Sequence, residues 1–293
     1  AVSSAGLALA FTIDRALVWD YSSATGPTKV VTLPLPFDLR PSDPLPLGAI
    51  VRNGPTNDYG VVAVAPSSGR ITFWENIDNA EARSLYPQRH QGVDGSVKLY
   101  SGEVITDLVD IEHAGFILNF SSGRLAQLTL RDSQGRPSVS TTVLSGPSVS
   151  SSSSLFSLRG LLGGAIRKTI ASVKARPSDT KGQMEVITTS KNGVFQLWDL
   201  SWSGQQIFKH EVDVHDEILS AVQAGISSEL RAQTDVQVLD FAVTEQARTL
   251  GSVNCLVLVA LFGRHSLDYS LLEVDLAASG GTINRMIPIK SFH

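Results

Sequence analysis

The chain has 293 residues, of which 42 % are hydrophobic and 18 % are charged, and its formal net charge is −4. A chain of this size and balance can bury a core, which excludes wholesale disorder. It contains one cysteine, Cys255, which excludes an intramolecular disulfide and a cysteine-rich zinc site.

Residues 1–11 are mildly apolar but have neither an initiator methionine nor a basic leader, so we expect a trimmed fragment and not a signal peptide. The longest apolar run, residues 255–262, is far shorter than the ~20 residues that a spanning helix needs. The sequence therefore gives no indication of a transmembrane helix.

Short strand patterns dominate the rest of the chain. Apolar runs bounded by Gly, Asn, Asp, Ser or Pro occupy residues 7–19, 61–74, 116–130, 184–198 and 253–262. Strands of this length between turn residues predict an all-β architecture.

Several of these runs form a repeated hairpin. In each copy, two strands flank a short polar turn, and the second strand ends at Trp19, Trp74, Leu128 or Trp198. These anchors are 55, 54 and 70 residues apart, which fits propeller blades of ~40–50 residues with insertions. We therefore predict one β-propeller domain over residues 1–293, with its last blades beyond the end of the chain; the alternative is a pair of β-sandwiches.

Residues 146–182 form a segment that does not fit this pattern. Residues 148–154 hold six serines, which predicts an exposed loop, and residues 155–173 follow with helical amphipathicity. The predicted apolar face and its flanks comprise Leu155, Phe156, Leu158, Leu161, Leu162, Ile166, Ile170 and Val173. Arg159, Arg167 and Lys168 provide electrostatic support beside a polar face that is mostly Ser and Gly.

Three interpretations of this amphipathic segment remain open. It is a helix in the plane of a membrane surface, a helix that binds a protein partner, or a helix docked on the propeller. Gly160, Gly163 and Gly164 each cost a helix about 1 kcal/mol relative to alanine, which favours a helix that forms only on binding. A sparsely charged polar face favours insertion into the packing defects of a curved bilayer.

A second helical pattern covers residues 216–233. Ile218, Val222, Ile226 and Leu230 share one face, and Asp216 can cap the start. We expect a small surface helix that packs on a blade.

Charge along the chain is uneven. Residues 133–178 contain no acidic residue but six basic ones, whereas the rest of the chain is acidic. A general nucleic-acid-binding protein would be basic over a broad face, so we expect no direct nucleic-acid contact. A basic island in an acidic body still allows contact with an anionic surface.

No catalytic or metal-binding pattern stands out. His210 and His215 lack a third ligand, and Glu103, Asp107 and Asp110 read as solvated residues. Cys255 heads an apolar run, where a core role is expected. We predict no enzyme activity, no cofactor, no metal and no small-molecule substrate; a propeller enzyme is the remaining alternative.

The combination of hairpins ending in Trp-Asp, the stretch SGRLAQLTLRDSQGRP at residues 122–137 and the Ser-rich amphipathic loop after it resembles one protein family. It is similar to the amino-terminal propeller of the outer-ring, Y-complex scaffold nucleoporins, in a fungal-type member. This resemblance implies a seven-bladed propeller, here possibly incomplete, at the nuclear pore complex of the nuclear envelope.

The resemblance also implies a function. It implies a structural scaffold module that supports nucleocytoplasmic transport, mRNA export and pore assembly, with other nucleoporins as partners and a membrane-curvature-sensing amphipathic loop. The stretch FTIDRALVWDY at residues 11–21 would also suit an inner-ring scaffold nucleoporin. A general protein-interaction propeller without a membrane role is the third alternative.

Overall fold

The computed structural model describes residues 6–22, 29–53, 58–84, 92–145, 169–224, 235–244, 252–263 and 267–292. These residues form five antiparallel sheets, and within each sheet the strands follow one another in chain order. Such up-and-down meanders are the blades that the repeated hairpin predicts.

Three sheets precede residue 145. The first consists of β1 (Leu7–Phe11), β2 (Arg15–Asp20) and β3 (Val30–Pro34). The second consists of β4 (Leu47–Asn53), β5 (Asp58–Val64), β6 (Arg70–Trp74) and β7 (Val93–Ser96), with helix α1 (Ile77–Ser84) between β6 and β7. The third consists of β8 (Ile105–Asp110), β9 (Phe116–Phe120), β10 (Leu125–Arg131) and β11 (Pro137–Val143).

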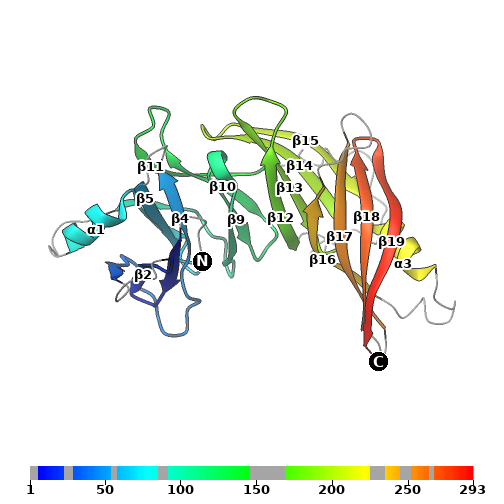
Figure 1. The fold of residues 1–293 in the computed structure, drawn as a ribbon, viewed down its shortest axis with the longest axis horizontal. Helices are drawn as coiled ribbons and strands as arrows, with labels where there is room; N and C mark the ends of the chain where they lie inside the picture. The colour runs from blue at the N-terminus through cyan, green and yellow to red at the C-terminus, as the bar shows by residue number, and fades with distance from the viewer. Residues whose placement is uncertain are drawn as a thin grey trace. The chain divides into compact units, whose positions relative to one another are not determined.

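Two sheets follow. The fourth consists of β12 (Ile170–Pro177), β13 (Gln183–Ser190), β14 (Val194–Ser201) and β15 (Gln206–Asp213). The fifth consists of β16 (Asp235–Val243), β17 (Val253–Phe262), β18 (Leu267–Ala277) and β19 (Gly280–Phe292). Figure 1 shows this last sheet in orange to red, with the yellow helix α3 (His215–Gln223) against β19.

The chain divides into two compact units. Unit 1 comprises residues 1–144 and 202–204, and unit 2 comprises residues 145–201 and 205–293. Unit 1 therefore contains the first three sheets and unit 2 the last two. The assignment of residues 1–293 to one propeller domain stays a prediction.

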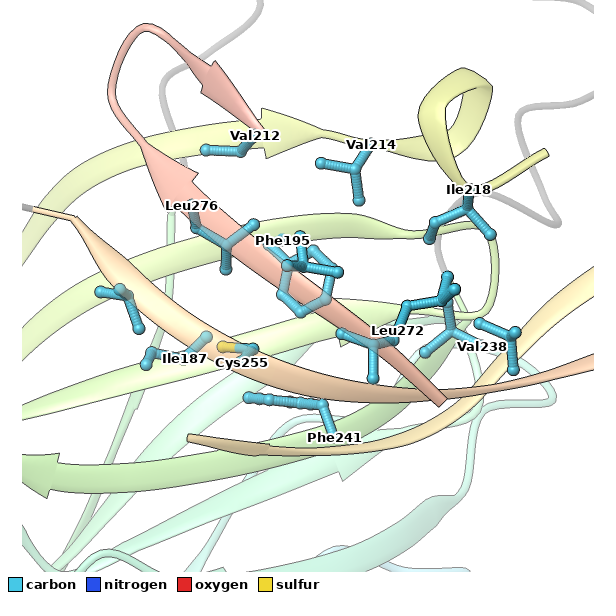
Figure 2. Packing of buried hydrophobic residues seen from close by; sticks show 14 of the residues in the cluster. Ile187, Phe195, Val212, Val214, Ile218, Val238, Phe241, Cys255, Leu272 and Leu276 are labelled. Atoms are coloured by element: carbon cyan, nitrogen blue, oxygen red, sulfur yellow. The ribbon is translucent and has the colours of Figure 1, made fainter. Parts of the chain in front are cut away.

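Each unit has its own buried core between successive sheets. In unit 1, one cluster joins the first and second sheets around Leu33 and Trp74, and another joins the second and third around Phe73 and Leu118. In unit 2, the core lies between the fourth and fifth sheets. Its Phe195 and Phe241 rings meet edge to face with centroids 5.5 Å apart, and Figure 2 shows Phe195 among side chains of both sheets.

The predicted hairpins are confirmed at their turns. Gly69, Gly123 and Gly193 all adopt positive φ, from 69° to 83°, which only glycine takes up without strain. Trp74 and Trp198 lie in the third strands of their sheets and are almost fully buried, as predicted for blade cores. Trp19 occupies a comparable position in β2 but is only half-buried.

The predicted surface helix is confirmed in part. In α3, Ile218 and Val222 are buried in the unit 2 core, as the pattern predicts. Asp216 lies inside the first turn and does not cap the helix; instead, the Asp213 carboxylate accepts a hydrogen bond from the backbone N–H of His215 at 3.0 Å. Ile226 and Leu230 lie outside the described residues.

The structure also contains a helix that the sequence patterns do not indicate. Helix α1 is only eight residues long and connects β6 to β7. Its Ile77 and Ala80 are buried in the core of unit 1.

Candidate functional site

Most of the predicted membrane-binding residues lie outside the described residues. This applies to the Ser-rich tract at 148–154 and to the following side chains: Leu155, Phe156, Leu158, Leu161, Leu162, Ile166, Arg159, Arg167 and Lys168. Their roles stay predictions. The structure describes the residues on both sides of this segment, up to residue 145 and from residue 169.

Both flanks of the segment are fixed to sheets by backbone hydrogen bonds. On the N-terminal side, the Leu144 N–H donates to the Leu125 carbonyl at 2.9 Å. On the C-terminal side, the Thr169 carbonyl accepts a bond from the Lys191 N–H, also at 2.9 Å. Residues 145–168 are therefore an insertion between the last strand of one sheet and the first strand of the next.

The prediction that the amphipathic helix extends to Val173 is wrong. Ile170 and Val173 belong to strand β12, which pairs with β13 over its whole length. Val173 is only 6 % exposed, so it cannot insert into a bilayer while β12 is folded. Helical periodicity matched here because residues three apart share a helix face, but pairing with β13 imposes strand geometry. The candidate membrane segment therefore ends at Ile166.

The basic island is largely neutralised where the structure describes it. An Arg136 guanidinium nitrogen lies 2.7 Å from the Asp132 carboxylate, and the Lys174 ammonium lies 3.0 Å from that of Asp240. Arg176 donates to Glu185. Three of the six basic residues thus pair with acidic residues that lie outside residues 133–178. The other three basic residues belong to the segment that the structure does not describe.

One of these ion pairs belongs to a network across all four strands of the fourth sheet. Glu185 in β13 accepts hydrogen bonds from Arg176 in β12 and from Lys209 in β15, and Lys209 also lies 3.1 Å from Asp199 in β14. Burial raises the pKa of Glu185, but its cationic partners outweigh burial and hold that pKa below its ordinary value. The charges of Arg176 and Lys209 are therefore engaged in holding the sheet.

A second buried ion pair corrects the prediction that Glu103 is solvated. The Glu103 side chain is 2 % exposed and is bound by Arg124, whose Nε donates at 3.1 Å. Burial alone would raise its pKa, but the hydrogen bonds from Arg124 and Ser122 lower the pKa of Glu103 to about 2. The Arg124 guanidinium also lies over the rings of Phe120 and Tyr100, 4.0 and 4.7 Å from their centroids. The other two carboxylates, Asp107 and Asp110, are exposed in β8, as predicted.

No three His, Cys, Asp or Glu side chains among the described residues gather as metal ligands. His210 lies in β15 and His215 begins α3, where its Nδ1 lies 3.1 Å from the Asn192 carbonyl. A groove of about 650 Å³ in unit 2 has three leucines in its lining, and its Lys174 and Asp240 are paired with each other.

Cys255 is a core residue, as the sequence predicts. It is fully buried beside Phe195 and Phe241 in the unit 2 cluster, and burial raises the pKa of its thiol to about 12. Because the thiolate is the reactive form, we expect no reaction with a thiol reagent such as Ellman's reagent in the native protein and one equivalent after denaturation. Rapid labelling of the native protein would contradict this burial.

None of the described helices is both long and apolar enough to cross a membrane.

Comparisons with known proteins find similarity to nucleoporins. A family model described as nucleoporin, Nup133 N terminal like, matches residues 2–288. Nucleoporin NUP133 of Chaetomium thermophilum is 35 % identical over 314 aligned residues, which cover 100 % of this chain and 23 % of the relative. Nucleoporin nup131 of Schizosaccharomyces pombe is 27 % identical and covers 68 % of this chain and 17 % of the relative. The chain thus spans less than a quarter of these relatives.

A solved structure gives the same fold. The crystal structure of the Vanderwaltozyma polyspora Nup133 beta-propeller domain matches with a TM-score of 0.75 and 20 % identity, over 99 % of this chain and 68 % of that chain. This likeness confirms the predicted β-propeller fold, in which the sheets are blades, and excludes the pair of sandwiches.

Proposed function

Because this chain belongs to the Nup133 N-terminal-like nucleoporin family, we propose that it is a structural scaffold module of the nuclear pore complex that touches the curved nuclear membrane through residues 155–166. The family match over residues 2–288 carries the scaffold part of this proposal. Other nucleoporins of the pore scaffold are its protein partners, and its role is structural, without catalysis or a cofactor.

The membrane part rests on the pattern of the segment and on its framework. Residues 155–166 place Leu155, Leu158, Leu162 and Ile166 on one helical face. Because hydrogen bonds hold Leu144 and Thr169 at both flanks, the sheets keep their structure whether or not the segment is bound. The charges of Arg136, Lys174 and Arg176 are engaged within the protein, so electrostatic support for apolar insertion comes from Arg159, Arg167 and Lys168 of the basic island.

Flotation with small vesicles tests the membrane contact. Replacement of residues 150–167 by a Gly-Ser linker should greatly reduce flotation, while the midpoint of thermal unfolding stays nearly unchanged, since the flanks are anchored outside the deletion. The matched control keeps the composition of residues 155–166 but shuffles their order, which removes the apolar stripe. Flotation that survives both changes would contradict the proposal and favour a scaffold contact with proteins alone.

A further inference from the structure

Unit 1 has one end at which hairpin turns and sheet-to-sheet connections meet. In an antiparallel meander, the turn between the second and third strands and the connection that leaves the fourth strand lie at the same end. We name this end the loop face of unit 1. It consists of residues 12–14, 35–46, 65–69, 97–104, 121–124 and 143–144.

Hydrogen bonds and one ion pair join neighbouring pieces of this face. The Leu35 N–H donates to the Asp14 carbonyl at 2.8 Å, and an Arg70 guanidinium nitrogen lies 3.9 Å from the Asp38 carboxylate. The Val97 N–H donates to the Gly69 carbonyl at 2.9 Å, and the Ile105 N–H donates to the Pro66 carbonyl at 3.1 Å. An Arg124 guanidinium nitrogen donates to the Lys98 carbonyl at 2.7 Å. The connection between the second and third sheets is thus fixed to the hairpin turns of both.

The loop face carries exposed apolar side chains at its tips. Ile13, Leu45 and Tyr100 are 42, 55 and 61 % exposed, and Val143 is 40 % exposed where the chain leaves the third sheet. Tyr100 has the amphipathic ring that favours a membrane–water interface. The residues that follow Val143 lead directly to the candidate membrane segment.

Charge distinguishes the loop face from the opposite end of the same three sheets. Counting the connections and the strand residues that adjoin them, the loop face has five basic residues, Arg15, Arg40, Arg70, Lys98 and Arg124, against Asp14, Asp38, Asp43 and Glu103. Among the residues whose side chains the structure describes, the opposite end has eight acidic residues against four basic ones; the acidic ones are Asp20, Asp58, Glu75, Asp78, Glu81, Asp110, Glu112 and Asp132. An anionic lipid surface would therefore repel the opposite end but not the loop face.

We propose that the loop face of unit 1 lies on the lipid bilayer as a second, weaker contact in addition to that of residues 155–166, with Leu45, Ile13 and Tyr100 entering the headgroup region. This inference rests on the proposed function, because it names further residues of the same membrane contact. The partner is a lipid surface. Two weak contacts on one chain reinforce each other, since the first raises the effective concentration of the second.

Substitutions with a matched control test the inference. In the full chain, Leu45→Ser should weaken binding to sonicated phosphatidylcholine vesicles with a minor phosphatidylserine fraction by about fivefold, because a half-exposed leucine can bury only its remaining area. Ile13→Ser should act similarly. The control is Val30→Ser, which changes a similarly exposed aliphatic residue, 49 %, at the opposite end of the first sheet.

A dye measurement gives an independent readout. Because Cys255 is buried and its thiol is poorly ionised, a cysteine introduced as Leu45→Cys or Val30→Cys can be labelled selectively with a polarity-sensitive dye. Vesicles should shift the emission of the dye at position 45 to the blue and leave the dye at position 30 unchanged.

The outcomes distinguish the inference on the loop face from the proposed membrane contact of residues 155–166. A fivefold loss with Leu45→Ser but not with Val30→Ser, together with the blue shift, supports the inference. If deletion of residues 150–167 reduces flotation while Leu45→Ser does not, the inference is overturned and the proposed function stands. Equal effects at positions 30 and 45 also overturn it, and absence of vesicle binding by the full chain overturns both.

Discussion

Replacement of Glu103 by alanine is expected to lower the free energy of unfolding by about 3–5 kcal/mol, since it leaves a buried guanidinium without its counter-charge. Arg124 is only 14 % exposed and lies over the rings of Phe120 and Tyr100, so water cannot readily replace the lost carboxylate. Urea unfolding followed by circular dichroism measures the change.

A surface ion pair of the same unit provides the control. Glu81 binds Lys29, whose side chain is 71 % exposed, and Glu81→Ala should cost less than about 1 kcal/mol because exposed pairs contribute little. Equal losses for Glu103→Ala and Glu81→Ala would contradict the account of a desolvated pair.

The same pair predicts how stability depends on pH. The pKa of Glu103 falls from an ordinary 4.5 to about 2 in the folded chain, so the folded state holds the carboxylate more strongly in its charged form. The resulting stability is fully present above pH 4.5 and is lost as the pH falls towards 2. Glu103→Ala should remove this part of the acid dependence.

Leu158→Asp is expected to abolish binding to small vesicles, which is the largest functional effect that we predict. The substitution removes about 1.5–3 kcal/mol of apolar transfer and adds the cost of desolvating a carboxylate in the middle of the apolar face. Leu162→Asp should act in the same way. Flotation with vesicles of neutral lipid measures the effect without a contribution from lipid charge.

Two control variants separate insertion from charge attraction. Ser157→Asp introduces the same charge on the polar face and should leave most of the binding intact. Arg167→Ser with Lys168→Ser should weaken binding to anionic lipid by at most about 1 kcal/mol per residue and keep the preference for small vesicles. Equal binding to large flat and small curved neutral vesicles would refute the curvature preference even if the segment touches the membrane.

The blades of this protein were predictable because their signals are local. The turns that contain Gly69, Gly123 and Gly193 each lie between two apolar strands, and hairpin formation depends on residues within about 15 positions of each other. Burial of Trp74 and Trp198 followed from the same repeat. The candidate membrane segment is likewise a matter of composition and periodicity, so its predicted residues up to Ile166 come from the sequence alone.

Tertiary structure decided the burial and pairing of residues whose partners are distant in the sequence. The sequence suggests a solvated Glu103 because Arg124, which neutralises it, is 21 residues away in the turn between β9 and β10. Ile170 and Val173 fit a helical stripe, and only pairing with β13 makes them a strand. The positive charges of Lys174 and Arg176 in the basic island are neutralised by Asp240 and Glu185, which belong to other strands. In each case the sequence determines the local conformational preference, but burial and charge pairing arise between strands, where the energy of long-range contacts outweighs local propensity.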